Sequence, residues 1–152
     1  MLKANERYVF DRMNSTAQKY KLGQKINEKL GVKKGIFDFS DQGGAAGYIT
    51  LKDDRGDDVT VPDNAIVKHS YYDVVTELQP SGGTPAVSIG LQSDGDIVAS
   101  VTKTVGQGDG TQDGAAANML KLTAERTLRL KVASADLTAG KLAAFLEYVI
   151  SE

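Results

Sequence analysis

Cysteine is absent from this sequence of 152 residues, and histidine occurs once, as His69. Without cysteine the fold needs no oxidising compartment, and zinc or iron–sulfur sites with cysteine ligands are excluded. A single histidine leaves too few imidazoles for most histidine-based metal sites, and a catalytic triad would depend on that one residue. We therefore expect neither a metal nor another cofactor.

Long apolar runs are lacking as well. No stretch approaches the ~18 apolar residues that cross a bilayer, and the charged start of the chain has no apolar segment of a secretory signal. We therefore expect no membrane partner. With 41% hydrophobic and 25% charged residues, the composition is that of a globular domain, and the length is sufficient for a buried core.

Charge of one sign is concentrated at the start of the chain. Residues 1–34 contain nine basic and three acidic residues, a net charge of +6, whereas residues 35–152 carry −8. This asymmetry suggests a leader that binds an acidic surface, attached to a soluble body, although a solvated helix face is the simpler alternative. We therefore divide the chain into a basic arm, residues 1–34, and a body, residues 35–152.

The arm is expected to be helical. Residues 4–30 contain no proline, and their apolar residues recur every three or four positions in two stripes. The stripes fall out of phase between Tyr20 and Leu22, next to Gly23, so we expect two helical pieces or one bent helix. Gly31 is expected to cap the end of this helix and to begin a short hinge to the body.

We expect the arm to bind a protein partner. Lysines would also suit phosphates, but the body is acidic, and Tyr71 and Tyr72 stand among acidic residues rather than basic ones. Nucleic acid is therefore not the expected partner. The candidate partner-binding residues of the arm are Lys3, Arg7, Phe10, Arg12, Met13, Lys19, Tyr20, Lys21, Lys25, Ile26 and Lys29.

The body is expected to be mostly β. Short segments rich in Val, Ile, Tyr and Thr alternate with Gly, Asp, Asn and Pro clusters. With no helical pattern between them, they favour an antiparallel β-sandwich or jelly roll. Residues 96–105 fit either a strand or a helical turn, and residues 106–117 are expected to form a flexible loop. The predicted strands are Ile36–Phe39, Gly47–Leu51, Asp58–Val61, Ile66–Leu78, Ala86–Leu91, Asn118–Leu122, Thr127–Ala133 and Leu142–Ile150.

Several motifs are better interpreted as turns than as binding sites. The glycines at 106, 108 and 110 lack the flanking strand and helix of a nucleotide-binding loop. The acidic cluster at residues 53–58 and the pair Asp94 and Asp96 lack the spacing of a calcium loop, so polar turns are favoured over Ca²⁺ sites. The integrin-type string at residues 55–57 is short enough to arise by chance, and we expect an ordinary turn there.

His69 and Ser70 are the nearest approach to a catalytic pair. They are neighbours in a predicted strand, and neighbouring strand residues point to opposite faces. His69 therefore cannot act as a base for Ser70, and it is expected on the strand surface or at an interface. We expect no catalytic residue and no enzymatic activity.

Six strings of the body carry a resemblance to a known family. They are Val61–Val67, Tyr71–Thr76, Ala86–Leu91, Asp96–Ser100, Leu122–Leu128 and Leu137–Lys141. In these strings and their order, this part of the sequence resembles small virion structural proteins of tailed bacteriophages, of the capsid decoration (cement) type. The resemblance covers about residues 36–150, and the arm lies outside it.

The resemblance implies a β-sandwich without catalytic residues. It also implies a protein made in the host cytoplasm that binds the major capsid protein on the capsid surface and stabilises the head. We expect a homo-oligomer, with a trimer favoured because capsids offer threefold sites. The alternatives are a neck, tail or fibre-base component of the virion, or a host-surface or glycan-binding module that uses the glycine-rich loop with Tyr71 and Tyr72.

Overall fold

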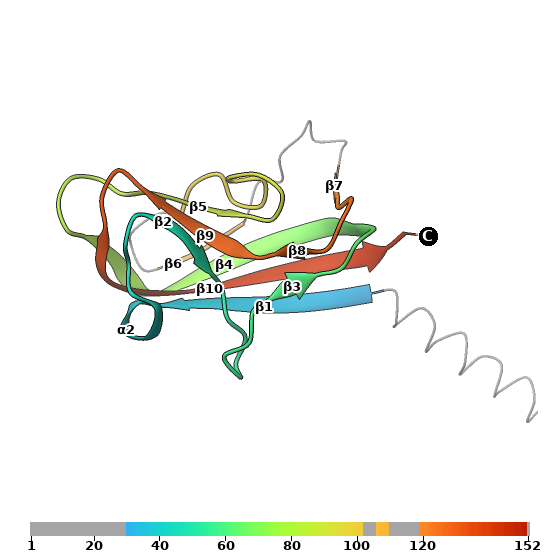
Figure 1. The fold of residues 1–152 in the computed structure, drawn as a ribbon, viewed down its shortest axis with the longest axis horizontal. Helices are drawn as coiled ribbons and strands as arrows, with labels where there is room; N and C mark the ends of the chain where they lie inside the picture. Colours follow the sequence, from blue (N-terminus) through green and yellow to red (C-terminus); the bar gives the residue numbers. More distant parts are fainter. Residues whose placement is uncertain (1–29, 102–105, 110–118, 152) are drawn as a thin grey trace, which may run out of the picture.

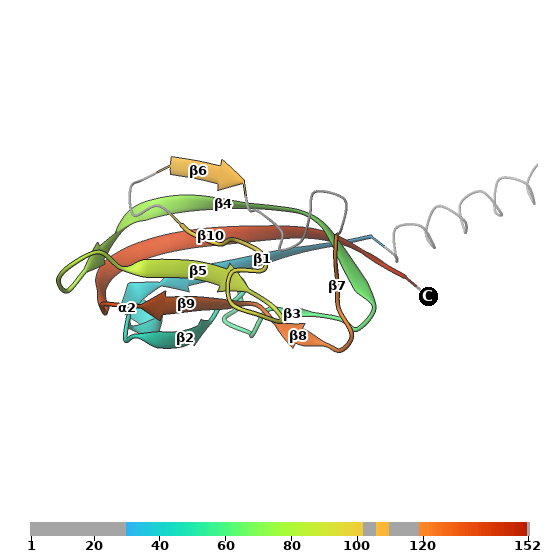
Figure 2. The same cartoon turned by 90° about the horizontal axis from the view of Figure 1, so that it is seen from above.

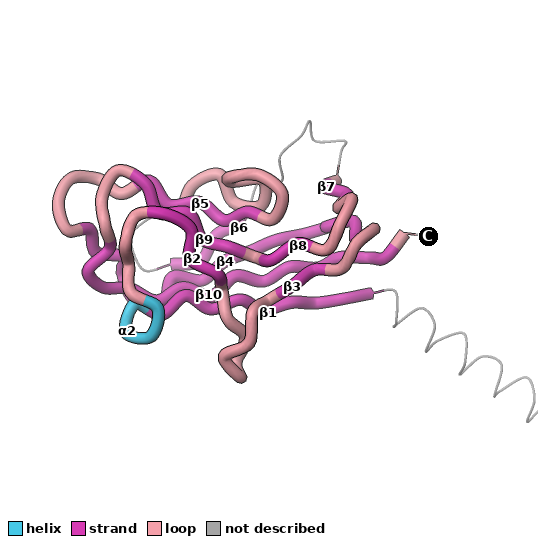
Figure 3. Tube along the Cα trace, in the orientation of Figure 1, coloured by secondary structure: helices cyan, strands magenta, loops and turns pink. Residues whose placement is uncertain are grey.

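The computed structural model describes residues 30–101, 106–109 and 119–151 (Figure 1). Strands dominate this part of the chain, and α2 is its one short helix, with four residues (Figure 3). No helix in the described ranges has the length and apolar character that crossing a membrane requires. The elements are β1 (Leu30–Asp38), α2 (Phe39–Gln42), β2 (Gly47–Thr50), β3 (Thr60–Val61), β4 (Ala65–Pro80), β5 (Ala86–Gly90), β6 (Gly106–Asp109), β7 (Leu120–Lys121), β8 (Arg126–Thr127), β9 (Arg129–Ala133) and β10 (Leu137–Ile150).

The strands form three antiparallel sheets. The largest has the order β1-β10-β4-β6, and β7 pairs with another part of β4. A second sheet has the order β2-β9-β5, and β3 pairs with β8. Both smaller sheets lie on the same side of the largest one (Figures 1 and 2). The prediction of a mostly β, antiparallel body is confirmed.

One hydrophobic core fills the space between the sheets. Leu142 and Leu146 of β10 and Val74 of β4 are fully buried on the side of the large sheet. Ile89 of β5 and Leu130 of β9 enter the same core from the sheet of β2, β9 and β5. Burial of each such side chain contributes roughly 1.5–3 kcal/mol, so this shared core holds the sheets together.

Alternation along the strands decides which side chains reach the core. Leu130 and Val132 of β9 are buried, whereas Arg129 and Lys131, which alternate with them, are only half-buried. Leu128 just before β9 is also fully buried. Alternation with Thr127, Arg129 and Lys131 in the sequence predicts that the three apolar residues share one side of the strand, because successive side chains point to opposite faces. The structure confirms this prediction.

The predicted helix cap and hinge at Gly31 are wrong, because residues 30–34 belong to β1. Leu30 pairs with Val149 and Gly31 with Tyr148 in β10. A Cβ atom on Gly31 would lie 2.0 Å from Cζ of Tyr148. Glycine suits this position because a tyrosine ring covers it, as often occurs at glycines within strands. The part of the arm predicted as helix at residues 1–29 lies outside the described residues.

Residues 106–109 form strand β6 instead of the loop predicted for residues 106–117. They pair with residues 71–74 of β4. A Cβ atom on Gly108 would lie 2.5 Å from Cζ of Tyr72, so the absence of a side chain lets the ring approach the strand. Backbone groups alone can make this pairing, which is why the lack of large side chains did not prevent it. The remainder of the predicted loop lies outside the described residues.

Replacing Gly35 by alanine should lower the free energy of unfolding by about 1–3 kcal/mol, because the added methyl group would overpack the core. The new methyl group would lie 2.8 Å from Cδ2 of Leu128 and 2.9 Å from Cβ of Leu51. Gly82→Ala is the matched control, since its methyl group would meet no atom within 4 Å. Urea denaturation measures both variants, and equal stabilities would contradict this packing.

Candidate interaction surfaces

The predicted partner-binding residues of the arm all precede β1. They lie outside the described residues, so their binding role stays a prediction. The described part nevertheless fixes where the arm is attached, because β1 begins at Leu30 at one end of the large sheet. Any contact that the arm makes therefore starts from this end of the sheet.

The acidic loop at residues 53–58 is a hydrogen-bonded turn. The Asp53 carboxylate accepts the backbone N–H of Asp57 at 3.0 Å and that of Arg55 at 2.8 Å. These hydrogen bonds hold the pKa of Asp53 below its usual value, and the bond from Asp57 has the largest effect. Gly56 at the tip has φ 88°, which glycine adopts at no steric cost. The predicted turn is confirmed, and the string at residues 55–57 is its exposed tip.

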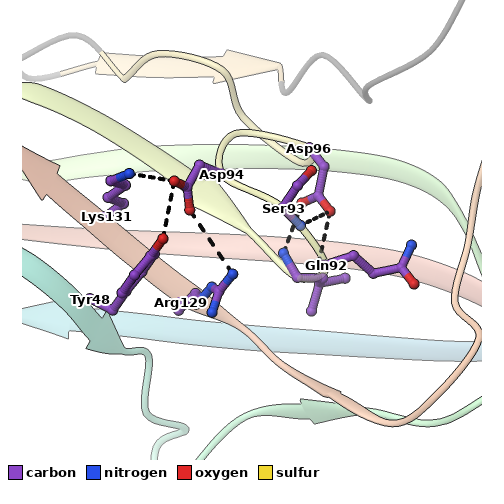
Figure 4. A network of polar contacts seen from close by, with 8 residues as sticks. Tyr48, Gln92, Ser93, Asp94, Asp96, Arg129 and Lys131 are labelled. Atoms are coloured by element: carbon purple, nitrogen blue, oxygen red, sulfur yellow. Dashed lines mark hydrogen bonds and ion pairs between the residues drawn. The ribbon is translucent and has the colours of Figure 1, made fainter.

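Asp96 is a buried carboxylate that organises the turn after β5. It is 1% exposed and accepts three backbone N–H groups, from Leu91, Gln92 and Ser93, each at 2.8 Å (Figure 4). The carboxylate therefore satisfies donors that would otherwise be buried without partners. The prediction of a turn at this aspartate is confirmed.

Asp94 lies at the centre of an exposed polar network on the sheet of β2, β9 and β5 (Figure 4). Its carboxylate pairs with Lys131, accepts the Tyr48 hydroxyl at 3.1 Å and lies 4.0 Å from Nη2 of Arg129. The guanidinium of Arg129 also lies 4.4 Å from the centre of the Tyr48 ring. The bond from Lys131, followed by that from Tyr48, keeps the pKa of Asp94 below its ordinary value. This network holds β2 and β9 to the turn after β5.

The face of the large sheet that points away from the core carries both apolar and charged side chains. Strand register places three rows of side chains there, because directly opposed residues of antiparallel strands share a face. Within the described part of the chain, both smaller sheets cover the opposite face (Figure 2). We define the outer sheet face by these residues: Leu30, Val32, Lys34, Ile36, Asp38, Ile66, His69, Tyr71, Asp73, Thr76, Lys141, Ala143, Phe145, Glu147 and Val149.

Aromatic rings lie near the middle of the outer sheet face. Tyr71 stacks on Phe145 of the adjacent strand, with ring centres 4.9 Å apart and planes 13° from parallel, and the His69 ring lies 5.6 Å from Tyr71. Towards the edge, Val32 is 66% and Leu30 51% exposed. The surface thus combines flat rings with exposed aliphatic groups, a composition that is common in protein interfaces.

The structure places two predicted pairs of residues on opposite faces. His69 is exposed on the outer sheet face, while Ser70 is 1% exposed and its hydroxyl donates to the Ile97 carbonyl at 3.4 Å. The prediction that they diverge is confirmed. Tyr71 and Tyr72 diverge in the same way, and Tyr72 is 8% exposed towards the core. These two tyrosines therefore cannot form the joint glycan-binding surface that the sequence suggested.

The outer sheet face itself was not predicted. Its signal in the sequence is weak, because Tyr71, Phe145 and Val149 occur in strands whose both faces carry apolar residues. Strands with apolar residues on both faces are usual in sheets that are covered on both sides. This pattern is the sequence feature that indicates a second covered face.

Comparison with known proteins identifies the fold through solved structures. No family model matches the sequence, and no curated protein matches it. A chain of the capsid of Ralstonia phage GP4 is 20% identical, with a TM-score of 0.57 over 81% of this chain and 85% of that chain. A chain of the Cyanophage Pam1 capsid asymmetric unit is 18% identical, with a TM-score of 0.58 over 80% and 85%.

A third similar structure is the acid-stable capsid of the Helicobacter pylori bacteriophage KHP30. The matching chain is 16% identical, with a TM-score of 0.51, and the match covers 81% of this chain and 89% of that chain. The similarities thus extend over most of each chain. At these identities they show a common fold, one that this chain shares with chains of phage capsids.

Substitution of Asp96 should destabilise the protein far more than substitution of Asp94. Asp96→Asn turns an NH₂ group towards buried N–H donors, which costs about 2 kcal/mol or more. Asp94→Asn, the matched control, removes charge from an exposed network and should change stability little. Thermal and urea denaturation compare the two variants, and a larger loss for Asp94→Asn would contradict these roles.

Proposed function

We propose that this chain is a non-enzymatic head-decoration (cement) protein of a tailed phage, with a β-sandwich body that binds the major capsid protein on the capsid surface. The observation that carries this proposal is the fold shared with chains of three phage capsids over most of their length. The resemblance of the strings in the body to those of decoration proteins supports the same role.

The described body suits a structural role on a shell. Its buried polar group Asp96 is satisfied by backbone donors, and its acidic turn at residues 53–58 is held by internal hydrogen bonds. These groups are engaged in maintaining the fold and are not arranged around a reacting molecule. A rigid body with a flat face is well suited to repeated, symmetric contacts, of which a trimer at a threefold site is the form we favour.

The basic arm provides the electrostatic part of attachment. Residues 1–29 carry a net charge of +4, and residues 30–152 carry −6. The arm is therefore suited to acidic patches on the shell, while the body avoids non-specific association. Many symmetric copies would add avidity to modest individual contacts.

Deleting residues 1–29 should reduce attachment to capsids that lack this protein by about tenfold or more, because each copy loses its electrostatic contact and the avidity falls with it. The deletion stops at residue 29 because residues 30–34 belong to β1. Occupancy is measured by co-sedimentation and electron microscopy, and circular dichroism verifies the fold. Full occupancy by the folded deletion variant would show that the arm is not the anchor.

A pair of charge variants separates the arm from general electrostatics. Replacing Lys21 and Lys25 by glutamine should weaken attachment several-fold and reduce its dependence on salt. Lys68 on β4 and Lys121 on β7 are exposed. Replacing these two lysines by glutamine removes the same charge from the body and should weaken attachment less. Equal effects of the two pairs would contradict a specific role of the arm.

A further inference from the structure

We propose that the free edge of β1 at residues 30–34 binds an extended segment of a partner protein, in which apolar and acidic side chains alternate. This site goes beyond the capsid role proposed above and does not depend on it. β1 is the first strand of the large sheet and pairs along its length with β10 on one side only. An open strand edge is a template for pairing with another chain, because its backbone groups still need partners.

The backbone groups of Leu30, Val32 and Lys34 face the open side of β1. Ile36 fixes this direction, because its N–H donates to the Lys52 carbonyl at 2.7 Å and its carbonyl accepts the Lys52 N–H at 3.0 Å. Every second residue of an antiparallel strand points its backbone groups to the same side, and the register of β1 with β10 is unbroken. Among the described residues, only Lys52 makes a backbone hydrogen bond to this row. The groups of the other three residues are therefore open to an added strand.

A cleft of about 330 Å³ beside this edge is one strand wide. Residues 32–34 of β1 form one wall, and the loop at residues 53–59 provides the other. Lys52 bridges to Ile36 on one side and to Asp58 on the other, so Asp58 lies two strand positions away from β1. An added segment would continue the position that Lys52 occupies. The second wall therefore selects a single extended segment over the edge of another folded sheet.

The two rows of β1 side chains predict the pattern of the segment. On the outer sheet face, the segment would lie beside Leu30 and Val32, which are 51% and 66% exposed, so apolar side chains suit these positions. On the opposite face it would lie beside Lys33. The side chains of Lys33 and of Arg55 in the far wall make no hydrogen bond or ion pair with another described residue. Carboxylates in the second row of the segment would pair with these two cations.

The carboxylates of the far wall already have partners within the chain. Asp53 accepts backbone N–H groups of its own turn, and Asp58 pairs with Lys52. Asp54 pairs with Lys34 at 2.8 Å and thereby joins the two walls. The side chains of this last pair are 39% and 70% exposed, and such exposed pairs contribute little to stability. An acidic segment can therefore compete with Asp54 for Lys34.

The binding test uses the full chain and a synthetic peptide of alternating valine and glutamate. A peptide with lysine in place of glutamate should bind at least about tenfold more weakly, because it meets unpaired cations. Lys33→Gln should weaken binding of the glutamate peptide several-fold, whereas Lys68→Gln, the matched control on β4, lies outside the cleft and should not. Asp54→Asn should strengthen binding, because it releases Lys34 and removes a negative charge. Isothermal titration calorimetry measures each affinity.

Amide hydrogen exchange identifies the edge that the peptide uses. With saturating glutamate peptide, the N–H groups of Val32 and Lys34 should exchange at least about tenfold more slowly, because each gains a hydrogen-bond acceptor. The N–H of Lys33 points to β10 and is the control within the same strand, whose exchange should change little. Absence of binding, equal affinities for the two peptides, or protection away from β1 would overturn the proposal. Because no capsid is present, these outcomes are independent of the capsid role.

Discussion

The pairing of β4 with β10 is the constraint on which the rest of the structure depends. These two strands have 16 and 14 residues, and their register runs from Ala65 opposite Ile150 to Pro80 opposite Leu137. Because side chains alternate, this pairing sends one row into the core and the other row to the opposite face. Leu142 and Leu146 thereby gain their burial under the smaller sheets, while Phe145 between them points outward with Tyr71. The same alternation creates both the stable core and the outer sheet face.

The sequence predicts the type of most elements but not how far they extend. Alternation in residues 127–133 identified β9 and its buried side, because that pattern is local. The start of β1 was missed, since the spacing of Leu30 continues a helical stripe and Gly31 resembles a helix cap. Its actual role depends on Tyr148, a residue far along the chain. β6 was missed because a glycine-rich strand pairs through its backbone and leaves no periodic pattern of side chains.

The candidate surfaces show the same limit. The turns at Asp53 and Asp96 could be predicted, because aspartate and glycine encode them within a few residues. The outer sheet face could not, because it depends on which side of each strand the smaller sheets cover. The positive charge of the arm was visible in composition alone. Together these features describe a body whose stability comes from the covered face of the large sheet, while attachment through the arm stays a proposal.

A reconstruction of the virion that contains this chain, at a resolution that separates strands, tests the account most directly. We expect the β body at symmetric positions on the outer surface of the head. Density for the body only at the neck or tail would contradict this.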